Sequence, residues 1–143
     1  MIGAKSGDKR VQVLLDELEL KYEIDSDGDF KVAFDLEEGR SHVAFIRSET
    51  TQFGKFDIRE IFAVAHISDG PIDPELANAL LIYNAQVKIG SWRVMRHDDD
   101  RCVVAFAAQI AANTDSRSLL TALHAVLQTA DEVESKLDEE DRF

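Results

Sequence analysis

The stretch that decides the fold is PIDPELANALLIYNAQVKIGSWRV, residues 71–94. Asp73 is suited to cap a helix, because its side chain can accept a hydrogen bond from a backbone N–H of the first turn. Pro74 fits the first helical position, where a missing N–H costs nothing. We expect a helix from this point to Gly90, a glycine placed where helices commonly end, and a strand directly after it.

Apolar residues extend further round this helix than one sheet can cover. A helix that packs by one face carries a single apolar stripe. Here apolar side chains also lie outside the stripe, which predicts a second buried surface, supplied by another helix of the chain or by a second subunit. The predicted partner or dimer interface comprises Leu80, Leu81, Ile82, Tyr83 and Trp92.

Upstream of this helix the apolar residues alternate with a period of two, which is typical of half-buried strands. The clearest case is FKVAFDL at 30–36, which follows Asp27-Gly28, a dipeptide typical of a two-residue hairpin turn. HVAFIRSETTQF (42–53) and FDIREIFAVAHI (56–67) predict two further strands. The last of these has apolar residues on both faces, which predicts that both faces are covered.

Amphipathic helices are predicted at both ends of the chain. The first is capped by Asp8 or Ser6, and the last begins at Thr114 or Asp115 and runs to about Leu137. Apolar residues of the last helix repeat every three or four positions, which is typical of a helix lying along a sheet or another helix. This seam consists of Leu119, Leu123, Val126, Ala130, Val133 and Leu137.

Between the central and last helices, residues 91–112 predict a hairpin with a charged tip at Asp98–Asp100. Its second strand is apolar on both faces and is expected inside the sheet. The order is helix, three or four strands, helix, two strands, helix. This order predicts an α+β fold with a mainly antiparallel sheet, in a single domain spanning residues 1–143 whose acidic tail, 138–143, frays.

Charge is the strongest signal in the composition. Twenty-eight acidic residues against sixteen basic ones give a net charge of -12, which argues against nucleic acid and anionic membranes as partners. No apolar run approaches the roughly 20 residues that span a bilayer, and the first residues lack the apolar core of a secretory signal. With a single cysteine, Cys102, which we expect to be a packed and inert thiol, we predict a cytoplasmic protein.

Asp25, Asp27 and Asp29 have the spacing of calcium ligands in an EF-hand loop, but the pattern then fails. Phe30 stands where the loop needs glycine, and Leu36 stands where it needs glutamate. We therefore expect an acidic hairpin tip and no metal.

His42 and His66 form the one candidate pair for metal binding or pH sensing. If the turn between their strands spans residues 53–55, the two histidines lie opposite each other on one face. If the turn has two residues, they point to opposite faces. Neither has a cysteine or carboxylate beside it in sequence, so we expect a structural role for both.

LLDELELKYEIDSDGDFKVAFDL (14–36) and the helix-to-strand passage LLIYNAQVKIGSWRV (80–94), in this order of elements, resemble the YbjN family. The resemblance extends from about Val11 to Leu137. It implies a fold like that of the small acidic type III secretion chaperones, and a non-enzymatic, cytoplasmic homodimer with a regulatory or client-binding role. It supplies no catalytic residues and no cofactor.

Two classes of function follow from these observations. The first is a dimeric binding protein that holds a protein or peptide partner while its acidic surface keeps the complex in solution. The alternative is a small-molecule or metal-binding regulator with a pocket near His42 and His66, which requires convergent polar groups. A scaffold subunit would differ from the first class only in its partner.

Overall fold

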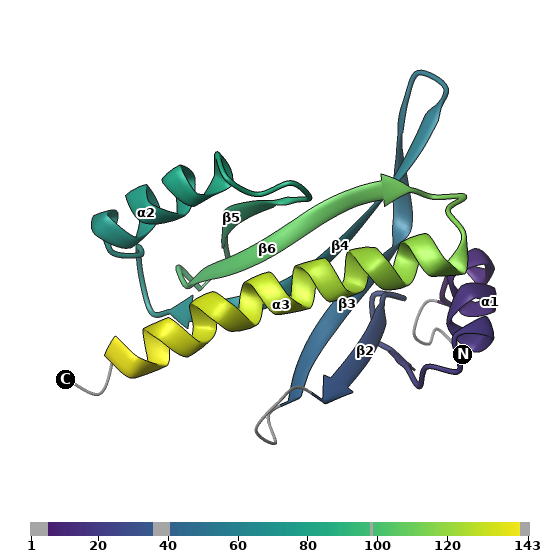
Figure 1. Ribbon diagram of the computed structural model, residues 1–143, viewed down its shortest axis with the longest axis horizontal. Coiled ribbons are helices and arrows are strands. Elements are labelled where there is room, and N and C mark those ends of the chain that lie inside the picture. The colour runs from purple at the N-terminus through teal and green to yellow at the C-terminus, as the bar shows by residue number, and fades with distance from the viewer. Residues whose placement is uncertain (1–5, 36–40, 98, 141–143) are drawn as a thin grey trace.

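The computed structural model describes residues 6–35, 41–97 and 99–140, with side chains as far as residue 137. Within these residues the chain forms three helices and six strands (Figure 1). In chain order they are α1 (Lys9–Glu17), β1 (Glu23–Ile24), β2 (Phe30–Asp35), β3 (Ser41–Phe53), β4 (Phe56–Ser68), α2 (Pro74–Asn84), β5 (Ser91–Arg96), β6 (Cys102–Ala111) and α3 (Ser116–Glu140).

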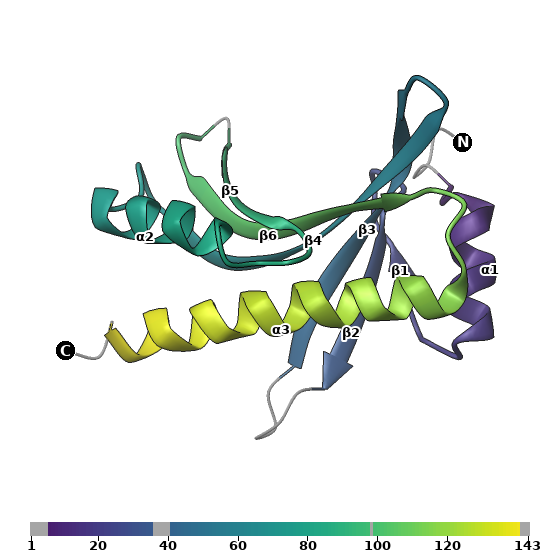
Figure 2. The same ribbon diagram turned by 45° about the horizontal axis from the view of Figure 1, so that its top comes forward.

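The strands form one antiparallel sheet in the order β1-β2-β3-β4-β6-β5. Helix α3 runs across one face of this sheet, α1 lies at one end of that face, and α2 lies beside the edge strand β5 (Figure 2). In the described part of the chain, no helix covers the opposite face. The predicted α+β fold and its order of elements are confirmed, with four strands before α2, but the predicted cover on both faces of β4 is not found.

Helix α3 closes the core on the covered face. Its cap is Asp115, one of the two predicted candidates, whose side chain accepts the Ser118 N–H at 2.7 Å. The predicted seam is buried from Leu119 to Val133, and Leu137 is partly buried against the same core. The strand residues beneath the helix include Phe30, Val32, Ala44, Ile46, Ile61, Ala63, Val104 and Phe106.

A buried ion pair joins α1 to the sheet. Asp8 caps α1 by accepting the Arg10 N–H at 2.9 Å, and its carboxylate also pairs with Arg59 of β4 at 2.8 Å. Arg59 is only 2% exposed and donates to the carbonyl oxygens of Arg47 and Ser48 at 2.6 and 2.9 Å. Burial alone would raise the pKa of Asp8, but hydrogen bonds from Arg10 and Arg59 outweigh it and hold that pKa well below its ordinary value.

A bulge in β3 lies where Arg59 donates these bonds. Between Ile46 and Thr50, β3 has two more residues than the facing part of β4. Backbone groups in a bulge lose their ladder partners, and the guanidinium supplies replacements. Beyond the bulge the β3–β4 ribbon leaves the sheet and projects from the molecule (Figure 1).

The first hairpin exists, but its predicted two-residue turn is wrong. Gly28 has the expected positive φ of 86°, yet Ile24 pairs with Phe30, so five residues connect the strands. The Asp25 side chain accepts the N–H groups two and four residues further on, at 2.9 and 3.0 Å. This local hydrogen bonding stabilises the longer turn.

Helix α2 begins as predicted and ends earlier than predicted. Asp73 caps it and the proline occupies the first turn. The helix stops at Asn84, so Gly90 does not end it. Gly90 has a φ of 82°, and a Cβ there would lie 2.6 Å from the carbonyl oxygen of Ala107, so this glycine instead permits close approach to β6.

Two predictions concern residues outside the described part of the chain, namely Leu36 at the end of the first strand and Asp98 in the charged tip. The predicted acidic tail is helical as far as Glu140, and its last three residues also lie outside the description. None of the helices in the described residues has the length and apolar character needed to cross a membrane.

The first prediction concerns the ion pair beneath α1. Asp8→Ala removes the cap and leaves the Arg59 guanidinium buried without its counter-charge, so we expect the free energy of unfolding to fall by about 3–5 kcal/mol. Urea denaturation measures this change. Asp16→Ala, an exposed acid on the same helix, is the control and should change stability by less than about 0.5 kcal/mol. Equal effects of the two substitutions would contradict the assignment.

The second prediction concerns acid. Because the pKa of Asp8 is lower in the folded chain than its ordinary 3.8, the unfolded chain binds more protons as the pH falls. The stabilisation from Asp8 is complete above about pH 5 and is lost progressively below about pH 4. We therefore expect the stability of Asp8→Ala to decline less steeply than that of the unsubstituted protein as the pH falls from about 4 to about 2, measured by urea denaturation. Parallel declines would show that Asp8 titrates normally.

Candidate functional site

The uncovered face of the sheet carries aromatic and cationic side chains. Phe45 and Phe62 pair across β3 and β4 and stack, with ring centroids 4.9 Å apart and planes at 10°. The Lys31 Nζ lies 5.9 Å from the centroid of Phe45, and the Arg47 guanidinium carbon lies 5.0 Å from that of Phe62. Cations over ring faces are attracted electrostatically, so these groups shield apolar surface that no described helix covers.

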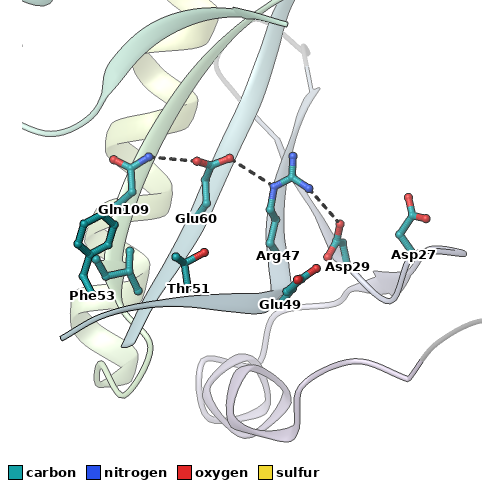
Figure 3. Close-up of a pocket in the computed structure, with 9 residues that line it drawn as sticks. Asp27, Asp29, Arg47, Glu49, Thr51, Phe53, Glu60 and Gln109 are labelled. Atoms are coloured by element: carbon teal, nitrogen blue, oxygen red, sulfur yellow. Dashed lines mark hydrogen bonds and ion pairs between the residues drawn. The ribbon is translucent and has the colours of Figure 1, made fainter. Parts of the chain in front are cut away.

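Glu60 connects four strands on this face. Its carboxylate accepts hydrogen bonds from Arg93 at 2.6 Å, Gln109 at 3.1 Å and Arg47 at 3.3 Å. Arg47 also approaches Asp29 at 3.9 Å, so a polar row runs from β6 to the β1–β2 turn (Figure 3). One carboxylate thus compensates two guanidinium groups.

A cavity of about 590 Å³ opens where the β3–β4 ribbon leaves the sheet (Figure 3). Every second residue of β3 from Arg47 to Phe53 lines it, because alternate side chains of a strand point to the same face. β4, β6 and the β1–β2 turn supply the remaining walls. The residues that give it its charge and its aromatic wall are Asp27, Asp29, Arg47, Glu49, Glu60 and Phe53.

The second candidate surface is the edge formed by α2 and β5. Leu81, Ile82 and Val94 are 68, 59 and 42% exposed, which is high for large apolar side chains. A shallow cavity of about 160 Å³ between α2 and β5 lies beside two of them, Leu81 and Val94. Leu81 and Val94 therefore present contiguous apolar surface at this edge, with Ile82 exposed on the same helix.

The five predicted interface residues differ in exposure. Leu80 and Trp92 are each 5% exposed and belong to the protein's own core. Tyr83 is half-buried, and its hydroxyl donates to Glu132 at 3.2 Å; burial and this carboxylate raise the pKa of Tyr83. Of the five, Leu81 and Ile82 have the exposure that contact with a partner requires.

Asn84 covers part of the edge strand. Its carboxamide accepts the Trp92 N–H at 2.6 Å and donates to the Trp92 carbonyl at 3.3 Å. These backbone groups point away from β6, so the side chain replaces a neighbouring strand at this position. The next outward-facing backbone groups are those of Val94, two residues further on. The free part of this edge is therefore short, with outward-facing backbone groups at Val94 and Arg96.

Neither predicted register of the histidine pair is correct. The turn after β3 has two residues, the case in which the two histidines were expected to point to opposite faces. Bulges in β3 and in β4 near Val64 shift the register instead. His42 and His66 both lie on the covered face. His42 is buried, with its Nε2 2.9 Å from the Val64 carbonyl oxygen and 3.4 Å from a Glu134 carboxylate. His66 instead lines a cavity of about 540 Å³ between α2 and α3, beside residues that include Val133.

The three aspartates of the first turn come together, with ligand atoms within 4.8 Å of one another. Hydrogen bonding accounts for two of them: Asp25 accepts backbone N–H groups of its own turn, and Asp29 accepts the Ser48 N–H at 3.0 Å. The arrangement of these aspartates fits a hydrogen-bonded acidic turn, which is how the sequence was interpreted.

Cys102 is buried at the start of β6, as predicted.

Sequence reasoning missed the parts of the site that depend on register. Alternation placed Phe45 on the face opposite Ile46, but it could not show that Phe62 stacks on it. No motif marks Glu60 in the sequence, because its hydrogen-bond partners Arg47, Arg93 and Gln109 lie on three other strands. Asn84 stood inside an apolar helix, and a polar residue in such a place is the one signal that could have identified its role.

Comparison with known proteins identifies no relative. No family model matches the chain, and searches of curated proteins and of solved structures gave no match. The resemblance to the YbjN family therefore stays a prediction. The structure itself defines an α+β protein with one uncovered sheet face and one apolar sheet edge.

The third prediction tests the edge. Asn84→Ala leaves the N–H and C=O groups of Trp92 without partners in a part-buried position, so we expect a loss of about 1–3 kcal/mol in the free energy of unfolding. Asn78→Ala on the exposed side of the same helix is the control. It should be neutral or slightly stabilising, because alanine is the better helix former. A neutral Asn84→Ala would show that the carboxamide contributes nothing to β5.

Proposed function

We propose that this protein is a non-enzymatic homodimeric binding protein of the cytoplasm, of the YbjN and secretion-chaperone-like type. In this proposal it holds a protein or peptide partner in a regulatory role, uses no cofactor and contacts neither nucleic acid nor membrane. The observation that supports it most is the apolar edge formed by α2 and β5, with Leu81, Ile82 and Val94 exposed.

Charge favours a second copy as the occupant of this edge. Residues 76–96 contain no aspartate or glutamate, although the chain has 28, and they contain three bases: Lys88, Arg93 and Arg96. The remaining residues therefore hold 13 bases and 28 acids, a net charge of -15. Two copies of so acidic a chain repel each other over most of their surface, and they approach with least repulsion at this edge.

Dimerisation at the edge would leave the uncovered sheet face free for a partner. That face combines an aromatic stack, hydrogen-bonding groups and a cavity, which are the features of recognition surfaces for extended segments. A binding role accounts for these features together.

The alternative is a small-molecule or metal-binding regulator near His42 and His66. The cavity beside His66 supports it, since both apolar and polar side chains line that cavity. His42 does not line that cavity, so the two histidines would not act on one ligand. Stoichiometric metal in the purified native protein, measured by elemental analysis, would favour this alternative.

The fourth prediction tests the dimer. Leu81→Glu places a carboxylate from each copy in the proposed interface, so we expect a dimer at micromolar concentration to become a monomer. Sedimentation equilibrium measures the mass. Val13→Glu, at an exposed apolar residue of α1, is the matched control and should remain dimeric. A monomeric unsubstituted protein at micromolar concentration would contradict the proposal.

A further inference from the structure

We propose that the cavity at the base of the β3–β4 ribbon binds a basic side chain of the partner, arginine in preference to lysine, within an extended peptide segment. This inference rests on the proposed function and adds the place and chemistry of partner recognition. It follows from the charge of the cavity, from its aromatic wall and from its size.

The lining of the cavity attracts cations. Asp27, Asp29, Glu49 and Glu60 line it with one base, Arg47, and Arg93 pairs with Glu60 from outside the lining, so four acids and two bases leave a local charge of -2. Arg47 is already paired with Glu60 and Asp29. Within the described residues, the carboxylates of Asp27 and Glu49 have no hydrogen-bond or ion-pair partner, and both side chains are exposed. Two carboxylates therefore remain available for a cation that the protein itself does not supply.

An aromatic ring lies at the opposite end of the cavity from Asp27, so an extended segment, and not one side chain, reaches both the ring and the carboxylates (Figure 3). Phe53 lines the cavity and is 69% exposed; it pairs with Phe56 next to the turn between β3 and β4. The same face already holds Arg47 against Phe62 at 5.0 Å, so a guanidinium fits its chemistry. A guanidinium pairs with carboxylates through a planar fork and stacks on a ring, whereas an ammonium offers only a point charge.

The size of the cavity fits a peptide side chain with adjoining backbone. About 590 Å³ lies within the range of sites that enclose small ligands. A bare divalent cation fits less well, because Asp25 and Asp29 already accept backbone N–H groups. An acidic segment or a phosphate backbone would meet the unpaired carboxylates and be repelled.

The fifth prediction uses a fluorescein-labelled octapeptide that alternates glycine and arginine, and the same peptide with citrulline in place of arginine. Citrulline keeps the shape of the side chain and removes its charge. In fluorescence anisotropy with the full chain, we expect the citrulline peptide to bind at least tenfold more weakly. We expect Asp27→Asn combined with Glu49→Gln to weaken the arginine peptide by at least tenfold, and Phe53→Leu by about two- to fivefold.

The control separates a site from general acidity. Asp16→Asn combined with Glu17→Gln removes the same two charges from the exposed side of α1 and should change the affinity by less than twofold. Circular dichroism checks that all variants are folded. Equal binding of the two peptides would overturn the inference. So would a loss in the α1 variant as large as that in the cavity variant.

Failure of the cavity inference and failure of the proposed function give different experimental results. If Asp27→Asn with Glu49→Gln remains a dimer and retains the partners captured from native cells, but the arginine peptide does not bind, the cavity inference fails and the binding function stands. If the unsubstituted protein is monomeric yet binds the arginine peptide at Asp27 and Glu49, the dimer fails and the cavity stands.

Discussion

The arrangement of the molecule depends on one buried guanidinium, that of Arg59. A charge that is 2% exposed is costly unless it is paired and hydrogen-bonded, and Arg59 meets this condition with Asp8 and two bulge carbonyls. These bonds hold the start of α1 against the sheet and stabilise the extra residues of β3. Because the bulge redirects the ribbon, the cavity on the uncovered face depends on an ion pair on the covered face.

Local patterns predicted the elements of this fold and their order. The caps Asp73 and Asp115, the alternation in β2 and the seam of α3 each involve residues within a few positions of one another, so sequence spacing determines them. The bulges could not be predicted in this way. The bond between Arg59 and Asp8 joins positions 51 residues apart, so sequence spacing does not reveal it or the bulge beside it. For this reason neither register considered for His42 and His66 was correct.

The end of α2 shows how a tertiary contact overrides a local signal. Gly90 has the residue type that commonly ends a helix, yet the helix stops at Asn84, whose carboxamide bonds the backbone of β5. The apolar surplus of this helix predicted a second buried surface, and within the protomer Leu81 and Ile82 are exposed. Only the structure shows which residues carry that surplus, because Leu80 is in the core and Leu81 is not.

Charge distribution connects the two candidate surfaces. Several arginines compensate acids within the chain: Arg59 and Arg10 with Asp8, and Arg47 and Arg93 with Glu60. Unpaired carboxylates then remain at the cavity, while residues 76–96 have none. A second copy would bind where carboxylates are absent, and a basic partner would bind where they are unpaired. These two surfaces lie on different parts of the sheet. Self-association at the edge would leave the acidic cavity open, so dimer formation and partner binding need not compete.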